Sequence, residues 1–370
     1  MTELFSRAKA SARALPLLSD KERSRVLLDV ADGIISGKDA LLAANAADLG
    51  RMDKASPLYD RLQLTEARLE AIAQDMRSVA ALPSPLGHVT KVKTLDNGLR
   101  LQRVSVPFGV IGMVYEARPN VTFDVFSLCF KSGNACVLKG GKDAHDSNRA
   151  AVETIHGVLR SHDIDPATVT LLPPTHEATA AMLTAVGYVD LCIPRGGRKL
   201  IDFVRDNARV PVIETGAGVV HTYFDKDGMI EMGKKIICNA KTRRVSVCNA
   251  LDCLLIHRER KWALPALCEQ LAEKHVVIYA DDEAYKVLSG NAYPYLEHAT
   301  AETYGTEFMD YKMAVRVVDS LDEALDHIDR YGSGHSEAIV TADKAAARRF
   351  QQQVDAACVY WNAPTSFTDG

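Results

Sequence analysis

The chain lacks the features that mark membrane, nucleic-acid-binding and disulfide-rich proteins. No stretch of its 370 residues approaches the ~20 consecutive apolar residues that span a bilayer. Its 44 Lys and Arg do not outnumber its 48 Asp and Glu, and the net charge of -4 leaves no basic footprint for nucleic acid. Its eight cysteines include no C-x-x-C pair and no Cys/His cluster at zinc spacing. We therefore expect reduced thiols, no structural metal, and neither nucleic acid nor membrane as a partner.

Secretion signals and the common nucleotide fingerprints are also missing. The N-terminus has neither the apolar core nor the small-residue cleavage site of a signal peptide, and with the dispersed cysteines this predicts a cytoplasmic protein. Neither G-x-G-x-x-G nor G-x-x-x-x-G-K-[ST] occurs. The length and the 47% hydrophobic content nevertheless predict a large core and at least two domains.

The N-terminal part of the chain has a helical pattern that gives way to a hairpin. Ser19 to Glu22 has the S-x-x-E form of a capping box before apolar residues at helical spacing. Helical sequence stops at Pro83 to Pro85. From Lys91 to Val106 apolar and polar residues alternate around Asn97-Gly98, a hairpin-turn dipeptide. This pattern predicts a β-hairpin arm that projects from the globular body.

After Pro107 short apolar runs alternate with helix-length segments, which is typical of a parallel sheet covered on both faces. A second series of runs follows Cys248, so we expect two successive α/β domains with a boundary near Gly218 to Lys226. The expected strands of the first domain lie at 110–114, 135–139, 169–172, 189–193 and 210–213. Those of the second lie at 254–256, 276–279, 314–318, 338–341 and 357–361.

The tract from Asn239 to Ala250 carries the strongest chemical signal. It places Cys248 shortly after Lys241, Arg243 and Arg244, in a polar break between helical and strand-like sequence. Nearby cations favour the thiolate, and a loop can aim backbone N–H groups at an oxyanion, which suits acyl transfer through a thioester. A small buried hydrophobe is the alternative for any free cysteine.

Two glycine turns at predicted strand ends are candidates for binding phosphate. Lys139 to Lys142 offers two lysines around a Gly pair, and Pro194 to Arg198 includes Gly196 and Gly197 before a helix. Ligands of open α/β sheets sit beyond the carboxyl ends of strands, and helix N-termini bind anions. Ordinary solvated turns remain an equal alternative for both segments.

Four strings carry a resemblance to a known family: the Cys248 tract, Y-E-A-R-P-N (115–120), K-S-G-N-A-C-V-L-K-G-G (131–141) and P-R-G-G (194–197). In this order they resemble the γ-glutamyl phosphate reductases of the aldehyde dehydrogenase superfamily. The resemblance implies NADPH-dependent reduction of L-glutamyl 5-phosphate to L-glutamate 5-semialdehyde in proline biosynthesis, with release of phosphate. It also implies a homo-oligomer and a possible transient contact with glutamate 5-kinase.

The resemblance further implies an aldehyde-dehydrogenase-like α/β fold of two Rossmann-like parallel-sheet domains. Residues 1–87 and 108–222 would form the NADP(H)-binding domain, 88–107 the oligomerisation hairpin arm, and 223–370 the catalytic domain. Members of the family continue for some tens of residues beyond the last residue of this sequence, with a strand that pairs with the arm. We therefore expect a C-terminal tail to be missing.

Residue roles follow from the resemblance. Cys248 matches the nucleophile that forms the glutamyl thioester, and Asn120 matches the asparagine that stabilises the oxyanion. Lys139 matches the lysine that binds the adenosine ribose, and Gly141 belongs to the same turn. Lys142 replaces the glutamate of NAD-preferring relatives, which favours NADP(H) because an ammonium attracts the 2′-phosphate.

Three arginines are candidates for binding the anions of the substrate: Arg118, Arg243 and Arg244. Solvated loop charges are an equal alternative for each of them. Glu214 stands near the place of the general base in hydrolytic aldehyde dehydrogenases, but acyl-phosphate reduction needs no activated water, so a structural role is expected. A hydrolytic or CoA-linked aldehyde dehydrogenase is the second enzymatic interpretation, and a binding protein on an inactive dehydrogenase scaffold is the non-enzymatic one.

Overall fold

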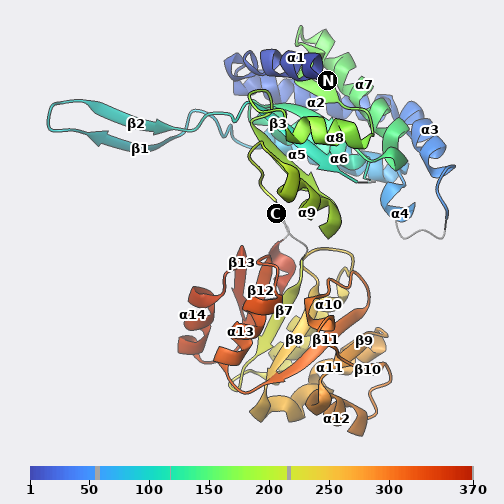
Figure 1. Ribbon diagram of the computed structural model, residues 1–370, viewed down its shortest axis with the longest axis vertical. Helices are drawn as coiled ribbons and strands as arrows, with labels where there is room; N and C mark the ends of the chain where they lie inside the picture. Colours follow the sequence, from blue (N-terminus) through green and yellow to red (C-terminus); the bar gives the residue numbers. More distant parts are fainter. Residues whose placement is uncertain (55–58, 117, 215–217, 369–370) are drawn as a thin grey trace. The chain divides into compact units, whose positions relative to one another are not determined.

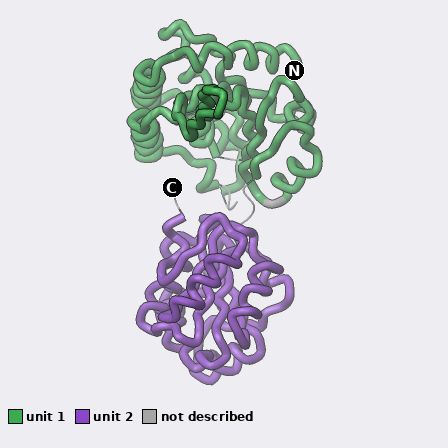
Figure 2. The backbone as a smooth tube through the Cα atoms, turned by 90° about the vertical axis from the view of Figure 1, so that its left-hand side faces the viewer, with its two compact units in different colours: residues 1–215 green, residues 216–370 purple. Residues whose placement is uncertain are grey.

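The computed structural model of the chain describes residues 1–54, 59–116, 118–214 and 218–368, apart from the side chain of Arg198. The chain divides into two compact units, Met1–Thr215 and Gly216–Gly370 (Figure 2). The division falls earlier than the expected boundary at 222, because β7 (Val220–Phe224) pairs with strands of the second unit. Both units combine a parallel sheet with helices, and the predicted α/β fold is confirmed. Within the described ranges no helix is long and apolar enough to cross a bilayer.

Helices make up the N-terminal part of the first unit, as predicted. The Ser19 hydroxyl accepts a hydrogen bond from the Glu22 N–H at 3.2 Å, and the Glu22 carboxylate accepts one from the Ser19 N–H at 2.7 Å, which confirms the capping box. The last long helix ends at Ala81, before Pro83. The helices are α1 (Thr2–Ala12), α2 (Asp20–Ser36), α3 (Lys38–Leu49), α4 (Tyr59–Leu62) and α5 (Glu66–Ala81).

The sheet of the first unit has four parallel strands in the order β5-β4-β3-β6. Helix α1 contacts β3 and β4, whereas α2 and α5 pack on α6 (Figure 1). The strands are β3 (Val110–Tyr115), β4 (Ala135–Lys139), β5 (Val169–Leu171) and β6 (Leu191–Arg195). The connecting helices are α6 (Asn120–Lys131), α7 (His145–Ser161), α8 (His176–Leu183) and α9 (Arg198–Asn207).

The strand expected at 210–213 does not form as predicted. Only an isolated bridge joins Val212 to Cys192 in this segment. Pro211 has no N–H to donate to a ladder, and two hydrogen bonds join the segment to Cys192: the Cys192 N–H donates to the Pro211 carbonyl at 2.8 Å, and the Ile213 N–H donates to the Cys192 carbonyl at 3.0 Å. The apolar run is therefore a short attachment to β6 rather than a full strand.

The predicted hairpin is a two-stranded antiparallel ribbon of β1 (Val89–Thr94) and β2 (Arg100–Val104). Gly98 adopts a φ of +85° in the turn, a conformation that favours glycine. Every residue of both strands is exposed, and in Figure 1 the ribbon extends away from the helices and sheet of the first unit.

The second unit contains a seven-stranded parallel sheet in the order β10-β9-β11-β8-β7-β12-β13. Two of its strands were not predicted: β7, which carries the buried polar residues His221 and Thr222, and β10, which has only three residues. The further strands are β8 (Leu251–His257), β9 (Val277–Ala280), β10 (Leu296–His298), β11 (Lys312–Val318), β12 (Ser336–Val340) and β13 (Cys358–Trp361). The helices are α10 (Ile230–Thr242), α11 (Leu264–Glu273), α12 (Asp282–Gly290), α13 (Leu321–Tyr331) and α14 (Lys344–Gln353).

Candidate active site

Cys248 differs from most of the other cysteines in its exposure. It lies in the loop between α10 and β8, and its side chain is exposed. Five cysteines are buried, and burial raises the pKa of Cys192 and Cys268 to about 12. A buried thiol of this kind stays protonated and unreactive, whereas an exposed thiol is accessible to a substrate. The structure therefore favours Cys248 as the nucleophile over the buried thiols.

The backbone of Cys248 is packed tightly against Gly218. A Cβ on Gly218 would lie 1.7 Å from the carbonyl oxygen of Cys248 and 2.7 Å from its Cα. Only glycine fits so close an approach. The Gly218 N–H donates to Glu307 Oε1 at 3.1 Å. The loop that carries Cys248 is thus held from one side by the backbone at Gly218, which has no side chain.

The short helix η6 (Thr365–Thr368) holds the other side of this loop. Thr365 Oγ1 donates to the carbonyl of Asn249 at 2.7 Å, and Ser366 Oγ donates to Asn239 Oδ1 at 2.9 Å. Arg243 Nη2 reaches the Ser366 carbonyl at 3.5 Å. The residues on both sides of Cys248 are therefore anchored to the same turn near the end of the described chain.

The position of Lys241 corrects one expectation from the sequence. This lysine does not lie in the loop: its side chain is fully buried in α10, with Nζ 3.9 Å from Asp252 Oδ1. Burial lowers the pKa of Lys241 to about 8 and raises the pKa of Asp252 to about 7. The ammonium is directed to Asp252, so the cations that remain on the loop are Arg243 and Arg244, both exposed.

The Gly-Gly-Lys turn lies at the carboxyl end of β4, where it was predicted. Lys139 is half-buried, and burial lowers its pKa, whereas Lys142 is exposed. A Cβ on Gly140 would lie 2.2 Å from Asn148 Nδ2, so this glycine is required by packing. Gly141 has an ordinary extended conformation, with φ of -69° and ψ of 159°. The turn thus contains two lysines that flank a pair of glycines, which have no side chains.

The second glycine turn contains a group that the sequence did not reveal. Gly197 precedes the first residue of α9, and its N–H donates to Glu116 Oε2 at 3.0 Å. A Cβ on Gly196 would lie 2.8 Å from the same carboxylate oxygen. Glu116 therefore occupies the helix N-terminus at which a phosphate was expected. A phosphate that uses this N–H has to replace the carboxylate.

Asn120 is the first residue of α6, and a carboxylate one turn later fixes its side chain. Asn120 Nδ2 donates to Asp124 Oδ2 at 2.9 Å. Because a carboxylate accepts hydrogen bonds, this contact assigns the amide NH₂ to the Asp124 side and leaves its second N–H for another acceptor. Burial raises the pKa of Asp124 to about 6, against the opposing effect of this hydrogen bond. Asp124 was not predicted from the sequence; the signal that could have found it is its position four residues after Asn120 on the same helix.

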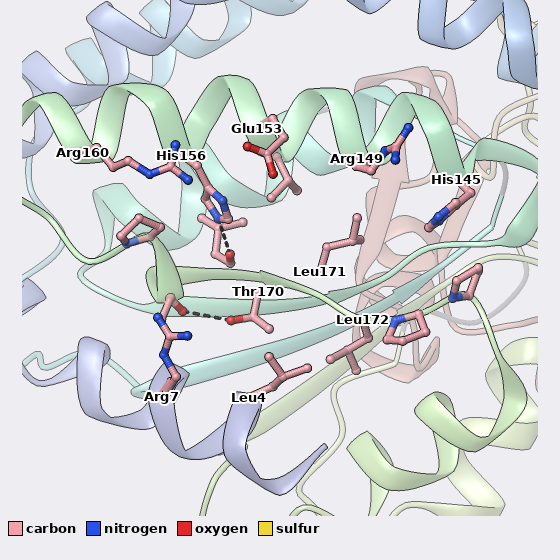
Figure 3. A pocket seen from close by; sticks show the side chains of 16 residues that line it. Leu4, Arg7, His145, Arg149, Glu153, His156, Arg160, Thr170, Leu171 and Leu172 are labelled. Carbon is pink, nitrogen blue, oxygen red and sulfur yellow. Dashed lines mark hydrogen bonds between the residues drawn. The ribbon is translucent and has the colours of Figure 1, made fainter.

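A cavity of about 840 Å³ lies between α7, the edge strand β5 and α1 (Figure 3). His145, the first residue of α7, follows the Gly-Gly-Lys turn in the sequence and lines one end of the cavity. In Figure 3 Arg149 and Glu153 line the same side, and His156 approaches the carbonyl of Val169 at 2.8 Å. The cavity gives this edge of the sheet room for a ligand larger than a phosphate.

Three buried side chains of the second unit resemble a metal site. Ligand atoms of His221, Cys253 and His327 lie within 4.8 Å of one another. Arg316 Nη1 donates to His327 Nδ1 at 2.8 Å, so the proton of this ring is on Nε2, which faces Cys253 Sγ at 3.8 Å. Burial, with the neighbouring cations, lowers the pKa of His327 to about 2. A protonated Nε2 and an adjacent guanidinium both oppose a cation at this position. His327 is instead linked by hydrogen bonds to Arg316 and Cys253.

Comparison with known proteins first shows the class of fold to which the chain belongs. No family model matches the chain. An acetylating aldehyde dehydrogenase from Geobacillus thermoglucosidasius is 15% identical, with a TM-score of 0.67 over 99% of this chain and 86% of that chain. At this identity the likeness shows the fold alone, and it defines an aldehyde-dehydrogenase-like protein.

Two relatives show the family. The γ-glutamyl phosphate reductase of Bacteroides thetaiotaomicron is 59% identical over 368 residues, which are 99% of this chain and 88% of that protein. The crystal structure of γ-glutamyl phosphate reductase from Thermotoga maritima is 35% identical, with a TM-score of 0.94 over 100% of this chain and 89% of that chain. The chain belongs to the γ-glutamyl phosphate reductase family, as the resemblance predicted.

Asp124 provides a test of the buried environment of Asn120. Because its pKa is raised in the folded chain, the stability it contributes is complete below about pH 4 and is lost as the pH rises through about 6. Asp124→Asn removes this titration. Relative to the parent protein, the free energy of unfolding of the variant should increase between about pH 4.5 and about pH 7.5, by on the order of 2 kcal/mol.

Urea unfolding at both pH values measures the difference. Asp96→Asn, in the exposed hairpin turn, is the matched control and should show no such change. A stability difference for Asp124→Asn that is the same at both pH values would contradict the raised pKa.

Proposed function

We propose that the protein reduces L-glutamyl 5-phosphate to L-glutamate 5-semialdehyde with NADPH and releases phosphate, as a step of proline biosynthesis in the cytoplasm. The observation that carries the proposal is the exposed Cys248 on a loop anchored from both sides, in a chain of the γ-glutamyl phosphate reductase family. The relatives' name supplies the substrate class. The cysteine supplies a nucleophile suited to an acyl phosphate.

In this mechanism the Cys248 thiolate attacks the acyl carbon, and the C–O bond to phosphate breaks to leave a glutamyl thioester. The Asn120 amide, oriented by Asp124, donates its second N–H to the oxyanion together with the N–H of Cys248. NADPH, when bound, supplies the hydride that reduces the thioester carbon. Collapse of the resulting thiohemiacetal releases the aldehyde and regenerates Cys248.

The residues of the first unit fit a phosphorylated nucleotide. Lys139 and Lys142 place two ammonium groups at the carboxyl end of β4, and Gly140 and Gly141 leave the turn free of side chains that would cover it. We assign the adenosine ribose to Lys139 and its 2′-phosphate to Lys142. Gly196 and Gly197 would contact the phosphates after displacement of Glu116.

We assign the phosphate and the carboxylate of the substrate to three arginines that lie close in sequence to Cys248 or to Asn120. Arg243 and Arg244 are exposed on the Cys248 loop, and Arg118 precedes the N-cap of α6, which starts at Asn120. A guanidinium binds carboxylate or phosphate oxygens with two parallel hydrogen bonds. Glu214 lies 3.8 Å from Arg205, an ion pair that is consistent with a structural role.

The exposed hairpin supports a homo-oligomer. Five apolar residues of β1 and β2 and of their turn are exposed: Val89, Val92, Leu99, Leu101 and Val104. An isolated two-stranded ribbon is marginally stable in water, so these residues need a covering surface. We propose a second copy of the chain as that surface. A transient contact with glutamate 5-kinase would protect the labile acyl phosphate from hydrolysis.

The nucleophile is tested by Cys248→Ser. We expect loss of turnover with the fold intact, because a serine hydroxyl is a weak nucleophile at neutral pH without an activating base. The assay is NADP⁺ reduction by glutamate 5-semialdehyde, with and without inorganic phosphate, and it also separates this enzyme from hydrolytic and CoA-linked dehydrogenases. Cys238→Ser, on the neighbouring helix, should retain activity. Near-normal turnover of Cys248→Ser would refute the assignment.

Cofactor choice is tested by Lys142→Glu. The change replaces attraction to the 2′-phosphate by repulsion, so kcat/KM for NADP⁺ should fall by about tenfold or more relative to that for NAD⁺. Lys199→Glu, an exposed charge reversal after the second glycine turn, is the control for a general loss of positive charge. An unchanged ratio of the two cofactors would remove Lys142 from the site.

The anion site is tested by Arg118→Met, Arg243→Met and Arg244→Met in the same assay. Loss of one bidentate contact should raise KM for phosphate or semialdehyde by about tenfold, the size of losing ~1.4 kcal/mol of binding. Arg348→Met, on α14, is the control. If all three variants keep the parent KM for both substrates, backbone N–H groups must form the anion site.

A further inference from the structure

The sheet of the second unit contains an irregularity close to Cys248. β7 pairs Val220 with Leu251 and then His221 with Cys253, so the register shifts by one residue and Asp252 is the extra residue on β8. An extra residue of this kind leaves backbone groups unpaired and redirects a side chain, and such bulges occur next to active sites. The bulge here lies four residues after the nucleophile.

The Asp252 carboxylate accepts hydrogen bonds from two backbone N–H groups, one at the irregularity and one in the segment before β11. Oδ2 accepts the Val220 N–H at 3.4 Å, and Oδ1 accepts the Phe308 N–H at 3.1 Å. Both carboxylate oxygens are therefore used by N–H donors from two different segments. An asparagine offers one acceptor oxygen and would turn an NH₂ donor toward the other N–H.

Lys241 pairs with this carboxylate at a high energetic cost. Both side chains are almost completely buried, and Lys241 Nζ makes no hydrogen bond within the part of the chain that the structure describes. Replacing such a buried pair by apolar groups is often neutral or stabilising, so stability alone does not explain it. A role in fixing local geometry is the remaining physical reason to retain it.

The segment that Asp252 binds is 218–220, whose first residue, Gly218, packs against the backbone of Cys248. Its three consecutive N–H groups each donate to a side chain: Gly218 to Glu307 at 3.1 Å, Val219 to Ser333 Oγ at 2.9 Å, and Val220 to Asp252. Glu307 directly precedes Phe308, which Asp252 also binds. Side chains from three parts of the unit thus fix the backbone that contacts the Cys248 carbonyl.

We propose that Asp252, neutralised by Lys241, is a positioning residue for the nucleophile. It holds Val220 and Phe308 in place, keeps Gly218 against the Cys248 carbonyl, and thereby sets the direction in which the loop presents Sγ. The proposal rests on the assignment of Cys248 as the nucleophile. It predicts a defect in the chemical step rather than in ligand binding.

The test compares Asp252→Asn, the double variant Lys241→Met/Asp252→Asn and a control. The control is Asp225→Asn, another buried aspartate, which follows the carboxyl end of β7 and binds Tyr223 and Thr341. Asp252→Asn should lower kcat by about tenfold or more and leave KM for NADP⁺ and phosphate within about twofold. Asp225→Asn should keep kcat within about twofold of the parent value.

The double variant separates positioning from stability. Removal of both buried charges should restore the thermal unfolding midpoint toward that of the parent protein, yet kcat should remain low because one of the two N–H groups, of Val220 or Phe308, still lacks its acceptor. Recovery of kcat together with the midpoint would overturn the proposal. So would a kcat of either Asp252 variant within about twofold of the parent, or an equal loss of kcat in Asp225→Asn.

Iodoacetamide labelling with peptide mass spectrometry distinguishes failure of the positioning role of Asp252 from failure of the proposed function. Labelling of Cys248 in the parent protein should account for its inactivation. If inactivation instead follows the labelling of another cysteine, the nucleophile assignment is wrong, whatever the Asp252 variants show. If Cys248 labelling does inactivate and Asp252→Asn retains its kcat, the positioning role alone is refuted.

Discussion

The contact between Gly218 and the Cys248 carbonyl is the constraint on which the candidate site depends. A Cβ at position 218 would overlap the carbonyl oxygen, at 1.7 Å, so the start of β7 and the loop before β8 can meet only through glycine. The two backbones are in direct contact at this point. The side chains that bind the three N–H groups of residues 218–220 therefore hold the backbone that contacts the Cys248 carbonyl.

Polar residues are buried in the centre of the second sheet, in strands next to this contact. His221, Asp252 and Glu337 are buried near the N-terminal ends of β7, β8 and β12, where an apolar core would be cheaper. Each has a partner: His221 Nδ1 lies 3.4 Å from Glu337 Oε1, Glu337 Oε2 accepts the His221 backbone N–H at 2.7 Å, and Asp252 accepts two backbone N–H groups. His221 and the neighbouring Thr222 concealed β7 from sequence reasoning, since its run has no continuous apolar pattern.

The sequence predicted those elements whose burial is apolar and continuous. β3 and β4 were found because their apolar runs are unbroken, and the capping box at Ser19 was visible from two side chains. Contacts between residues far apart in the chain could not be predicted from the sequence. The burial of Lys241 depends on Asp252 across the unit's core, and the failure of 210–213 to form a strand depends on Pro211. The family was predictable from local strings, whereas pairing between distant segments was not.

Glu116 shows how such an unpredicted pairing affects the proposed cofactor site. Its carboxylate already accepts the Gly197 N–H, so a nucleotide phosphate at this helix N-terminus exchanges one anion for another. An exchange of like charges at the same donor adds little net free energy. Most of the electrostatic attraction for the nucleotide must then come from the turn after β4, where Lys139 and Lys142 are. In the proposed cofactor site the glycines of the second turn would contribute chiefly by leaving space beside the helix, and the choice between cofactors would depend on the lysines.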